Sequence, residues 1–311
     1  MCKDRSYLFL DYRYLEEARL HMDGSVMDHK GRLKECLLDT IQQEGLDTLR
    51  FEKSISWELH REFSEYFAGH QLVFLPGDPL AEDARTVKDL GELTAIRQSA
   101  DINNRIFERI LEELKPGVSE IEIKRKLEIS LREMGGRDSS FDLIVLFGVG
   151  TSLPHGQAGG RVLERGMPVL LDIGVNFDGY ASDMTRMAFM GKPSSAFKDS
   201  HRFVLETQEE ALSMVKDGIA AKAIDQRVRE RFGDHGYELK HSTGHGVGLE
   251  IHERPFLGPK STEILRTDMV ITIEPGLYQK DGYGIRIEDL VIVKDEGCEV
   301  LTNPTKELIL L

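Results

Sequence analysis

The stretch VLLDIGVNFDGYASDMTR (residues 169–186) decides the fold of the larger part of this chain. It begins with an apolar run and continues through Asp178-Gly179, a dipeptide typical of a two-residue hairpin turn. It ends in a second run in which apolar and polar residues alternate. The stretch therefore predicts a β-hairpin with one aspartate, Asp172 or Asp183, in each strand.

The length of the turn decides how the two aspartates face each other. With a two-residue turn, Asp172 lies opposite Thr185, and Asp183 sits diagonally across on the same face; with a four-residue turn, the two aspartates are directly opposite. In both cases the carboxylates share one face of the hairpin. Like charges that close raise each other's pKa unless a cation lies between them. Two solvent-facing aspartates on an edge hairpin are the alternative for this pair taken alone.

Two glutamates and a histidine occur in similar contexts. Glu274 ends an apolar run before Pro-Gly, and Glu288 lies in an alternating run in which Arg286 shares its face. His245 stands between glycines in STGHGVGL (residues 242–249), which lets backbone and ligand approach closely. Ionised carboxylates are rarely buried unless a positive charge compensates them. Four carboxylates and one imidazole therefore predict a site for two divalent cations, and with it a hydrolase.

The composition is that of a globular protein of about two domains. The chain has 311 residues, of which 40% are hydrophobic and 30% charged. Its net charge of −14 and the lack of a Lys/Arg run argue against nucleic acid as a partner. No apolar run suggests a secretory signal or a membrane span, so a cytoplasmic protein is expected. Three scattered cysteines, Cys2, Cys36 and Cys298, are expected to be free thiols.

Apolar periodicity predicts two domains, 1–83 and 84–311, joined near the turn-rich segment 75–80. In the first domain we expect a strand at 7–10 and a helix at 32–44. In the second, helical periodicity and capping signals predict four helices, at 93–114, from Ser119 to Gly135, at 197–215 and at 223–232. Short apolar or alternating runs predict five strands, at 141–147, 168–175, 181–190, 268–274 and 284–293. This mixture predicts an α+β fold.

The chain also contains a faint internal repeat. KPGVSEIEI (residues 115–123) is similar to KDGIAAKAI (residues 216–224), and each segment joins one predicted helix to the next. Each copy is followed by strands that hold candidate ligands. A duplicated unit of this kind would fold as two halves that face each other across a shared site, although turn chemistry alone could also produce the similarity.

Other catalytic patterns are absent from the sequence. His252-Glu253 lacks the second histidine of an HExxH helix, and no GxSxG, Walker A or strand-linked GxGxxG motif occurs. Three further histidines have a context that suggests a role: His155 precedes a glycine, and His241 and His252 flank His245. The remaining six histidines are expected to be structural.

Taken together, LDIGVNFDGYASDMTR, STGHGVGLEIHE, TIEPGLY and GIRIEDLV resemble the pita-bread metallopeptidases, which include methionine aminopeptidases, aminopeptidase P and prolidase. The resemblance extends from about residue 85 to the C-terminus. It implies a pita-bread domain with pseudo-twofold symmetry, a homodimer and two divalent metal ions. The ions expected first are Mn²⁺ or Co²⁺, and Fe²⁺ or Zn²⁺ are the alternatives. By this resemblance Asp172 and Asp183 bind one metal as a pair, His245 and Glu274 hold the other, and Asp183 and Glu288 bridge.

Context within the family favours the members that cleave before proline. Arg286, two residues before the last glutamate, is similar to these members, as are SLPHG (residues 152–156) and the extra histidines His241 and His252. LDYRYLEE (residues 10–17) resembles a strand of the creatinase-type domain that precedes their peptidase domain. Since about one helix and one strand precede that motif in relatives, a shortened creatinase-type α/β domain is expected at the N-terminus.

The implied activity is hydrolysis of the bond preceding proline in small peptides with proline at the second position, as an Xaa-Pro dipeptidase or aminopeptidase. By resemblance, a metal-bridging hydroxide attacks the carbonyl, Glu274 carries the proton to the leaving nitrogen, and His155 and His252 contact the substrate or the oxyanion. Arg286 and His241 would steady the site or contact the substrate. The alternatives are a methionine aminopeptidase and a non-catalytic binding module of the same fold, and the intact set of five ligands argues against the second.

Overall fold

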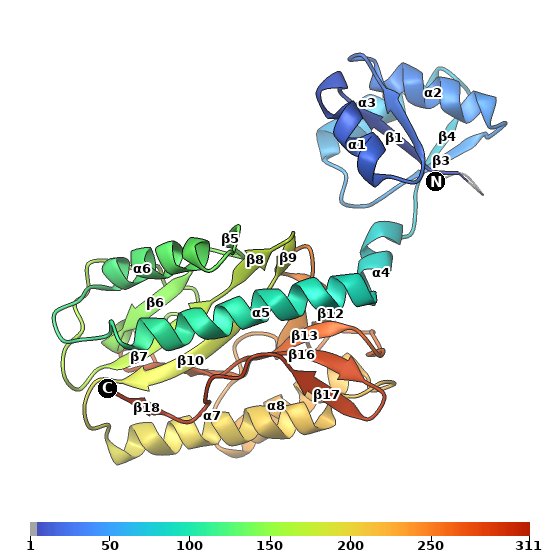
Figure 1. Cartoon of the computed structure of the whole chain (residues 1–311). Helices are drawn as coiled ribbons and strands as arrows, with labels where there is room; N and C mark the ends of the chain where they lie inside the picture. Colours follow the sequence, from blue (N-terminus) through green and yellow to red (C-terminus); the bar gives the residue numbers. More distant parts are fainter. Residues whose placement is uncertain (1–4) are drawn as a thin grey trace. The chain divides into compact units, whose positions relative to one another are not determined.

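The computed structural model describes residues 5–311 and divides the chain into two compact units (Figure 1). One unit ends at Ala81, within the short helix α4 (Leu80–Thr86), and the other is Glu82–Leu311. Each unit has its own hydrophobic core. All the predicted site residues belong to the second unit, so the fold of that unit positions the site.

The unit that ends at Ala81 is a small α/β assembly. Two pairs of parallel strands form its sheets, β1 (Tyr7–Leu10) with β2 (Ser25–Asp28) and β3 (Thr48–Phe51) with β4 (Val73–Pro76). Its helices are α1 (Leu15–His21), α2 (Leu33–Gln43) and α3 (Trp57–Ala68). Leu38 and Ile41 of α2 belong to the same buried cluster as Phe63 and Phe67 of α3, and this cluster forms the core of the unit.

The strand expected at 7–10 is confirmed as β1, and the segment 10–17, which resembles a strand of the creatinase-type domain, shares only Leu10 with it. Strand β1 ends at Leu10, and the side chain of Asp11 then accepts a hydrogen bond from the backbone N–H of Arg13. This bond caps a 3₁₀ turn, η1 (Tyr12–Tyr14), that leads directly into α1. A local side-chain cap therefore ends the strand and starts a helix.

Two main sheets form the centre of the second unit. The first has the strand order β18-β10-β7-β6 and the second β12-β11-β13-β16-β17. The strands of the first sheet are β6 (Ile144–Phe147), β7 (Pro168–Ile173), β10 (Met184–Phe189) and β18 (Ile309–Leu310). Those of the second are β11 (Gly244–Gly246), β12 (Glu253–Leu257), β13 (Val270–Ile273), β16 (Asp289–Lys294) and β17 (Gly297–Val300).

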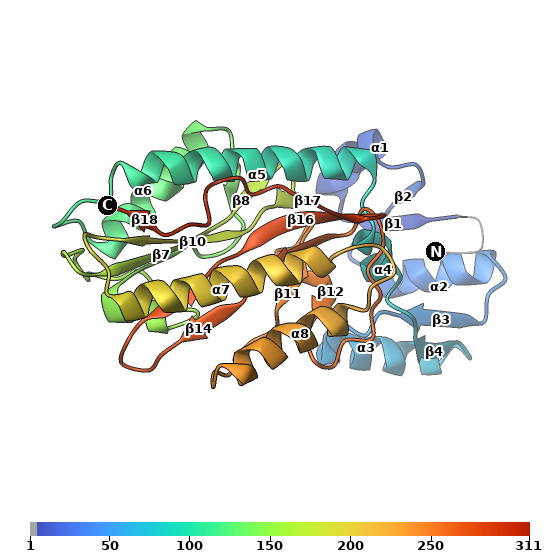
Figure 2. The same ribbon diagram turned by 90° about the horizontal axis from the view of Figure 1, so that it is seen from below.

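Four helices pack on these strands, two on each side (Figure 1). They are α5 (Leu90–Leu111), α6 (Glu120–Glu133), α7 (Ser195–Met214) and α8 (Ala221–Asp234). Alternate residues of the first sheet belong to different cores: Val169 and Leu171 pack with α5 and α6, whereas Leu170 packs with α7 and α8. The view from below brings α7 and α8 to the front (Figure 2). The predicted helices are therefore confirmed, including the capping box of Ser119 and Glu122 that starts α6.

The two halves of the second unit repeat one backbone pattern. Between α5 and α6 the N–H of Gly117 donates to the carbonyl of Leu163, and between α7 and α8 the N–H of Gly218 donates to the carbonyl of Leu265 in the same way. Both glycines have positive φ, 100° and 79°, which side chains disfavour. These are the segments whose similarity predicted a duplication, and their matching geometry confirms it.

The hairpin formed by residues 169–186 has the two-residue turn. Strand β8 (Val175–Phe177) pairs with β9 (Tyr180–Ala181) across Asp178-Gly179, and both turn residues have positive φ. The register continues into β7 and β10, where Asp172 lies opposite Thr185. A two-residue strand, β5 (Asp138–Ser139), completes this sheet by pairing with β8.

The single strand expected at 284–293 is wrong, because the structure divides it. Its first part, β15 (Gly284–Arg286), pairs with β14 (Gly276–Tyr278), and its second part is β16, which pairs with β13. Between them the N–H of Glu288 donates to the carbonyl of Thr185 in the other sheet, at 3.2 Å. The break lets this segment join the two sheets at the position of Glu288.

Arg186 fastens the two main sheets together and is only 1% exposed. Burial opposes ionisation of its partner Asp289, but Arg186 and Lys306 hold the pKa of that carboxyl below its ordinary value. The guanidinium of Arg186 donates to the carboxylate of Asp289 at 2.6 Å and to four backbone carbonyls, those of Thr185, Glu288, Thr302 and Pro304. A buried cation with this many partners ties β10 to β16 directly beside the predicted site.

Cys36 and Cys298 are free thiols, as expected, and Cys2 lies outside the described residues. Among the helices of residues 5–311, none is both long enough and apolar enough to cross a membrane.

We expect Arg186→Met to lower the free energy of unfolding by about 3–5 kcal/mol, because it leaves the buried carboxylate of Asp289 without its main partner. Urea unfolding followed by circular dichroism measures this change. The control is Arg105→Met, which breaks the exposed pair with Asp101 and should cost less than about 1 kcal/mol. Equal costs for the two variants would contradict the role of Arg186 in joining the sheets.

Candidate metal centre

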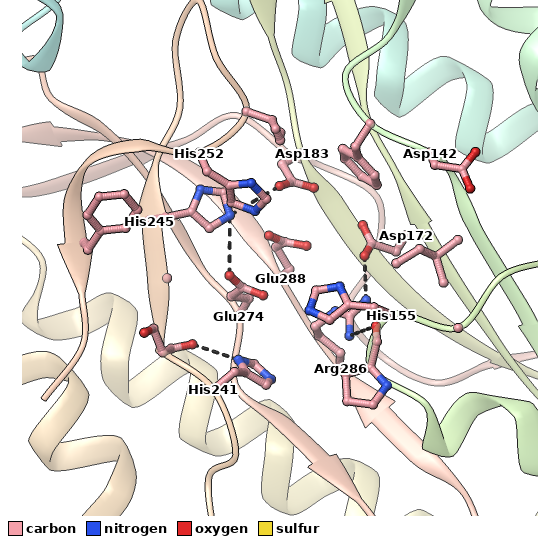
Figure 3. Close-up of a pocket in the computed structure, with 18 of the residues that line it drawn as sticks. Asp142, His155, Asp172, Asp183, His241, His245, His252, Glu274, Arg286 and Glu288 are labelled. Carbon is pink, nitrogen blue, oxygen red and sulfur yellow. Dashed lines mark hydrogen bonds and ion pairs between the residues drawn. The ribbon is translucent and has the colours of Figure 1, made fainter. Parts of the chain in front are cut away.

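One cavity of about 470 Å³ in the second unit brings the predicted site residues together (Figure 3). The apolar part of its lining includes Phe141, Ile144, Ile251 and Phe256. All nine side chains singled out from the sequence line it: His155, Asp172, Asp183, His241, His245, His252, Glu274, Arg286 and Glu288.

The four carboxylates occupy matching places in the two halves. Asp172 lies near the end of β7 and Glu274 directly follows β13, which is the corresponding strand of the second sheet. Asp183 directly precedes β10, and Glu288 directly precedes β16. Each half therefore supplies two carboxylates, and the junction of the two sheets places all four in one cavity.

The closest group in the cavity consists of Asp183, His245 and Glu288, each of which offers a ligand atom within 4.8 Å of the others. Nε2 of His245 lies 3.6 Å from a carboxylate oxygen of Asp183 and 3.5 Å from one of Glu274. Asp183 is 5% and Glu288 2% exposed. These distances are short enough for one or two small cations to contact several of the side chains at once.

Burial and mutual repulsion act together on the carboxylates. Burial, and after it the charge of Glu288, raise the pKa values of both Asp183 and Glu274 well above their ordinary range. Burial and the charge of Asp172 raise the pKa of Glu288 to about 8. Without a cation the cluster resists full ionisation at neutral pH, and a cation would relieve this.

The imidazole of His245 fits a metal ligand. Burial, and then the neighbouring His252, lower the pKa of His245 to about 4, so the ring is neutral at neutral pH. Its Nδ1 lies 3.0 Å from the carbonyl of Gly246, which can only accept, so Nδ1 carries the proton. Nε2 therefore presents a lone pair to the carboxylate oxygens of Asp183 and Glu274. Acceptors that face one another in this way leave a place that suits a cation.

Asp172 also fits a metal ligand. A chain of hydrogen bonds runs from it through Arg286 and Tyr278 to His241. One carboxylate oxygen of Asp172 is buried without a hydrogen-bond partner, and the other accepts from Arg286. Arg286 also donates to the hydroxyl of Tyr278 at 2.6 Å, and Tyr278 lies 3.1 Å from Nε2 of His241. Since Nδ1 of His241 faces the carbonyl of Ser242, its Nε2 accepts from Tyr278. Oxygen and imidazole donors of this kind suit Mn²⁺, Co²⁺, Fe²⁺ or Zn²⁺.

His252 and His155 approach the cavity on two separate segments. The ring of His252 lies 4.3 Å from that of His245, centre to centre, and burial lowers its pKa. His155 follows η2 (Gly148–Ser152) and Pro154, whose carbonyl accepts from Arg286 at 3.2 Å. Both imidazoles therefore border the carboxylates without belonging to the closest group.

Several residues that the sequence did not single out hold these groups in place. The hydroxyl of Thr185 donates to Glu288 at 2.7 Å and accepts from Arg286 at 3.0 Å. The hydroxyl of Thr272 accepts from the backbone N–H of His245 at 3.1 Å. Tyr278 and the two threonines lie within or beside the quoted motifs. No periodicity or spacing in the sequence gives the direction of a hydroxyl group, which explains why they were missed.

Two buried carboxylates outside the cavity fix the histidine segments and were also missed. Asp225 of α8 accepts from the backbone N–H and the hydroxyl of Thr243, at 3.1 and 3.0 Å. Glu253, next to His252, forms a buried ion pair of 2.6 Å with Lys88. In the sequence both are ordinary charged residues, because their partners lie 18 and 165 residues away.

Comparison with known proteins decides the family. A model described as metallopeptidase family M24 matches residues 94–295. The chain is also 35% identical to an Xaa-Pro dipeptidase of Pyrococcus horikoshii, over 86% of this chain and 76% of the relative. The chain belongs to metallopeptidase family M24.

Solved structures agree with this M24 assignment. An Xaa-Pro dipeptidase from Bacillus anthracis matches with a TM-score of 0.94 and 37% identity, over 99% of this chain and 87% of that one. An X-Pro aminopeptidase from Thermotoga maritima matches with a TM-score of 0.88 and 35% identity, over 99% and 88%. The predicted pita-bread fold is therefore confirmed, and membership of the family implies divalent metal ions.

We expect Asp183→Ala and Glu288→Ala to abolish the binding of two Mn²⁺ ions, because each removes a carboxylate from the centre of the cluster. Isothermal titration of the metal-stripped protein measures the stoichiometry. Without metal, both variants should unfold at the same or a higher temperature than the parent protein, because they relieve repulsion. Asp142→Ala is the matched control, since this carboxylate lines the cavity but pairs with Lys124. Unchanged stoichiometry in both cluster variants would contradict the assignment.

Proposed function

We propose that this M24 metallopeptidase is an exopeptidase that hydrolyses the peptide bond preceding proline. The observation that carries the proposal is the convergence of four carboxylates and the neutral His245 in one cavity of a chain from this family. Relatives that match 97–99% of the chain are described as Xaa-Pro dipeptidase, X-Pro aminopeptidase or prolidase, which supports specificity for proline.

The charge of the cavity supports exopeptidase action. Five carboxylates line it, including Asp142, against one guanidinium, and that guanidinium is paired with Asp172. A peptide with a free α-amine would place its ammonium group beside this acidic cluster. A peptide bond far from an N-terminus has no such charge to offer.

Five side chains would hold two divalent cations in this proposal, and Mn²⁺ or Co²⁺ are the ions we propose. Asp172 and Asp183 would face one ion, His245 and Glu274 the other, and Asp183 and Glu288 would be shared. When bound, such cations polarise the scissile carbonyl and make a nucleophile from water available near neutral pH. The lone pair of His245 and the unpartnered oxygen of Asp172 support this ligand set.

Glu274 is the residue that we propose moves the proton. The nitrogen of a prolyl peptide bond carries no hydrogen, so it must receive a proton before it leaves. Glu274 lies in the cavity, with its side chain 17% exposed, and its carboxylate faces Nε2 of His245. It would take the proton of the attacking water and deliver it to the proline nitrogen as the carbon–nitrogen bond breaks.

Two of the histidines would bind the substrate, whereas the third histidine and the arginine would hold the site in place. His155 and His252 border the cavity and would donate to the substrate carbonyl as negative charge develops on its oxygen. Four donors of Arg286 are already used, on Asp172, Thr185, Tyr278 and the carbonyl of Pro154. His241 has both ring nitrogens engaged. We therefore assign Arg286 and His241 to holding the site rather than to binding the peptide.

The proposal also covers the oligomeric state and the compartment of the enzyme. We propose that it acts on small peptides as a homodimer in the cytoplasm. The free thiols of Cys36 and Cys298 support a reducing compartment.

An assay on three peptides tests the proposed function. The metal-stripped protein is incubated with Ala-Pro, Ala-Pro-Ala or Met-Ala-Ser, each with and without Mn²⁺ or Co²⁺. We expect cleavage before proline that depends on the added metal. Cleavage of Ala-Pro alone identifies a dipeptidase, and cleavage of Ala-Pro-Ala identifies an aminopeptidase.

Two results would contradict the proposal. Release of methionine from Met-Ala-Ser alone would identify a methionine aminopeptidase. No cleavage of any peptide, with metal shown to be bound, would favour a binding module of the same fold.

A further inference from the structure

The segment that carries His155 is a loop closed at its neck by one carboxylate. The loop leaves β6 at Phe147, passes through η2 and His155, and returns to the start of α6 near Gly159. Glu120, the first residue of α6, accepts from the backbone N–H of Phe147 at 2.8 Å and from that of Gly159 at 3.0 Å. The two oxygens of one carboxylate therefore hold both ends of the loop.

The environment of Glu120 shows that this contact is built into the fold. The residue is only 4% exposed, and the guanidinium of Arg161 lies 3.7 Å from its carboxylate. A side chain at Gly150 would begin 3.3 Å from the same carboxylate, so a glycine lets the loop pass close to it. Backbone bonds from Glu120 and Ile121 to the carbonyls of Arg161 and Gly159 fix the returning strand of the loop to the helix.

The other side of the loop is held by the second half of the unit. The hydroxyl of Thr151 accepts from the backbone N–H of Gly284 at 2.9 Å, and the carbonyl of Pro154 accepts from Arg286. The loop is thus fixed at its neck by Glu120 and along its length by β15. His155 lies between these two points of attachment.

We propose that Glu120 is a positioning residue that acts through His155. This inference rests on the proposed function, since it treats His155 as a contact to the reacting peptide. A carboxylate that accepts two backbone N–H groups holds them at fixed separation, and charge-assisted bonds of this type are stronger than neutral ones. Loss of either bond lets the loop widen, and a displacement of about 1 Å at a substrate contact can cost roughly 100-fold in rate.

Glu120→Gln is the variant that tests this. The amide keeps the volume of the side chain but places an NH₂ group against one of the two backbone donors. We expect kcat/KM for the prolyl peptide that the enzyme cleaves to fall by roughly 10–100-fold. The matched control is Glu122→Gln in the same helical turn, an exposed residue that caps α6 through its hydrogen bonds with Ser119. It should change kcat/KM by less than about twofold.

A double-mutant cycle with His155→Ala separates positioning from a general structural effect. If Glu120 acts through His155, Glu120→Gln should cost less than about twofold once His155 has been replaced. Asp225→Asn provides the contrast, because Asp225 fixes the segment at Thr243, so its cost should be equal in both backgrounds. An equal cost of Glu120→Gln in both backgrounds, or no cost in the parent protein, would overturn the proposal.

A measurement without substrate keeps this proposal distinct from the proposed function. Hydrogen exchange of the metal-stripped proteins, followed by mass spectrometry, should show amides 148–158 exchanging at least several-fold faster in Glu120→Gln, with residues 241–252 unchanged. Unaltered exchange at 148–158 would overturn the role of Glu120 whatever the enzyme cleaves. Faster exchange together with no cleavage of prolyl peptides by the parent protein would leave the loop contact established and reject the substrate assignment.

Discussion

Mutual repulsion among four carboxylates, three of them buried and Glu274 partly buried, is the constraint on which the rest of this structure depends. Asp172, Asp183, Glu274 and Glu288 come from matching places in two halves of one duplicated unit, and neither half supplies more than two. Arg286 compensates one of them, and the neutral ring of His245 turns a lone pair toward two others. The fold therefore keeps together groups that would separate in water, and divalent cations are what such an arrangement can bind.

Holding these groups in place requires support from outside the cavity. Arg186 ties the two main sheets together beside Thr185 and Glu288, so the two pairs of carboxylates cannot drift apart. Buried carboxylates on α6 and α8, Glu120 and Asp225, each hold a segment that carries a histidine of the cavity. The duplication thus supplies the ligands, whereas the two supporting carboxylates stand at different positions of their helices, Glu120 at the first residue of α6 and Asp225 at the fifth of α8. A site fixed in this way needs little rearrangement when its ligands bind.

The local part of this structure could be predicted from the sequence. Asp178-Gly179 set a two-residue turn and the register that follows from it, and Ser119 with Glu122 marked the start of α6. Residue types and motif order also singled out nine of the residues that line the cavity. The sequence did not predict long-range geometry. Glu120 and Asp225 look like exposed helix residues in the sequence. Nothing in residues 284–293 signals that contacts from another sheet divide the run into two strands. Such features depend on partners many residues away, to which neither periodicity nor capping refers.

The most direct test of the central claim is to locate the metals. Crystals of the protein grown with Mn²⁺ would be measured at a wavelength where manganese scatters anomalously. The account requires two anomalous peaks in the cavity, one beside Asp172 and Asp183 and the other beside His245 and Glu274. A single peak, or none, in crystals that contain the ordered cavity would contradict it.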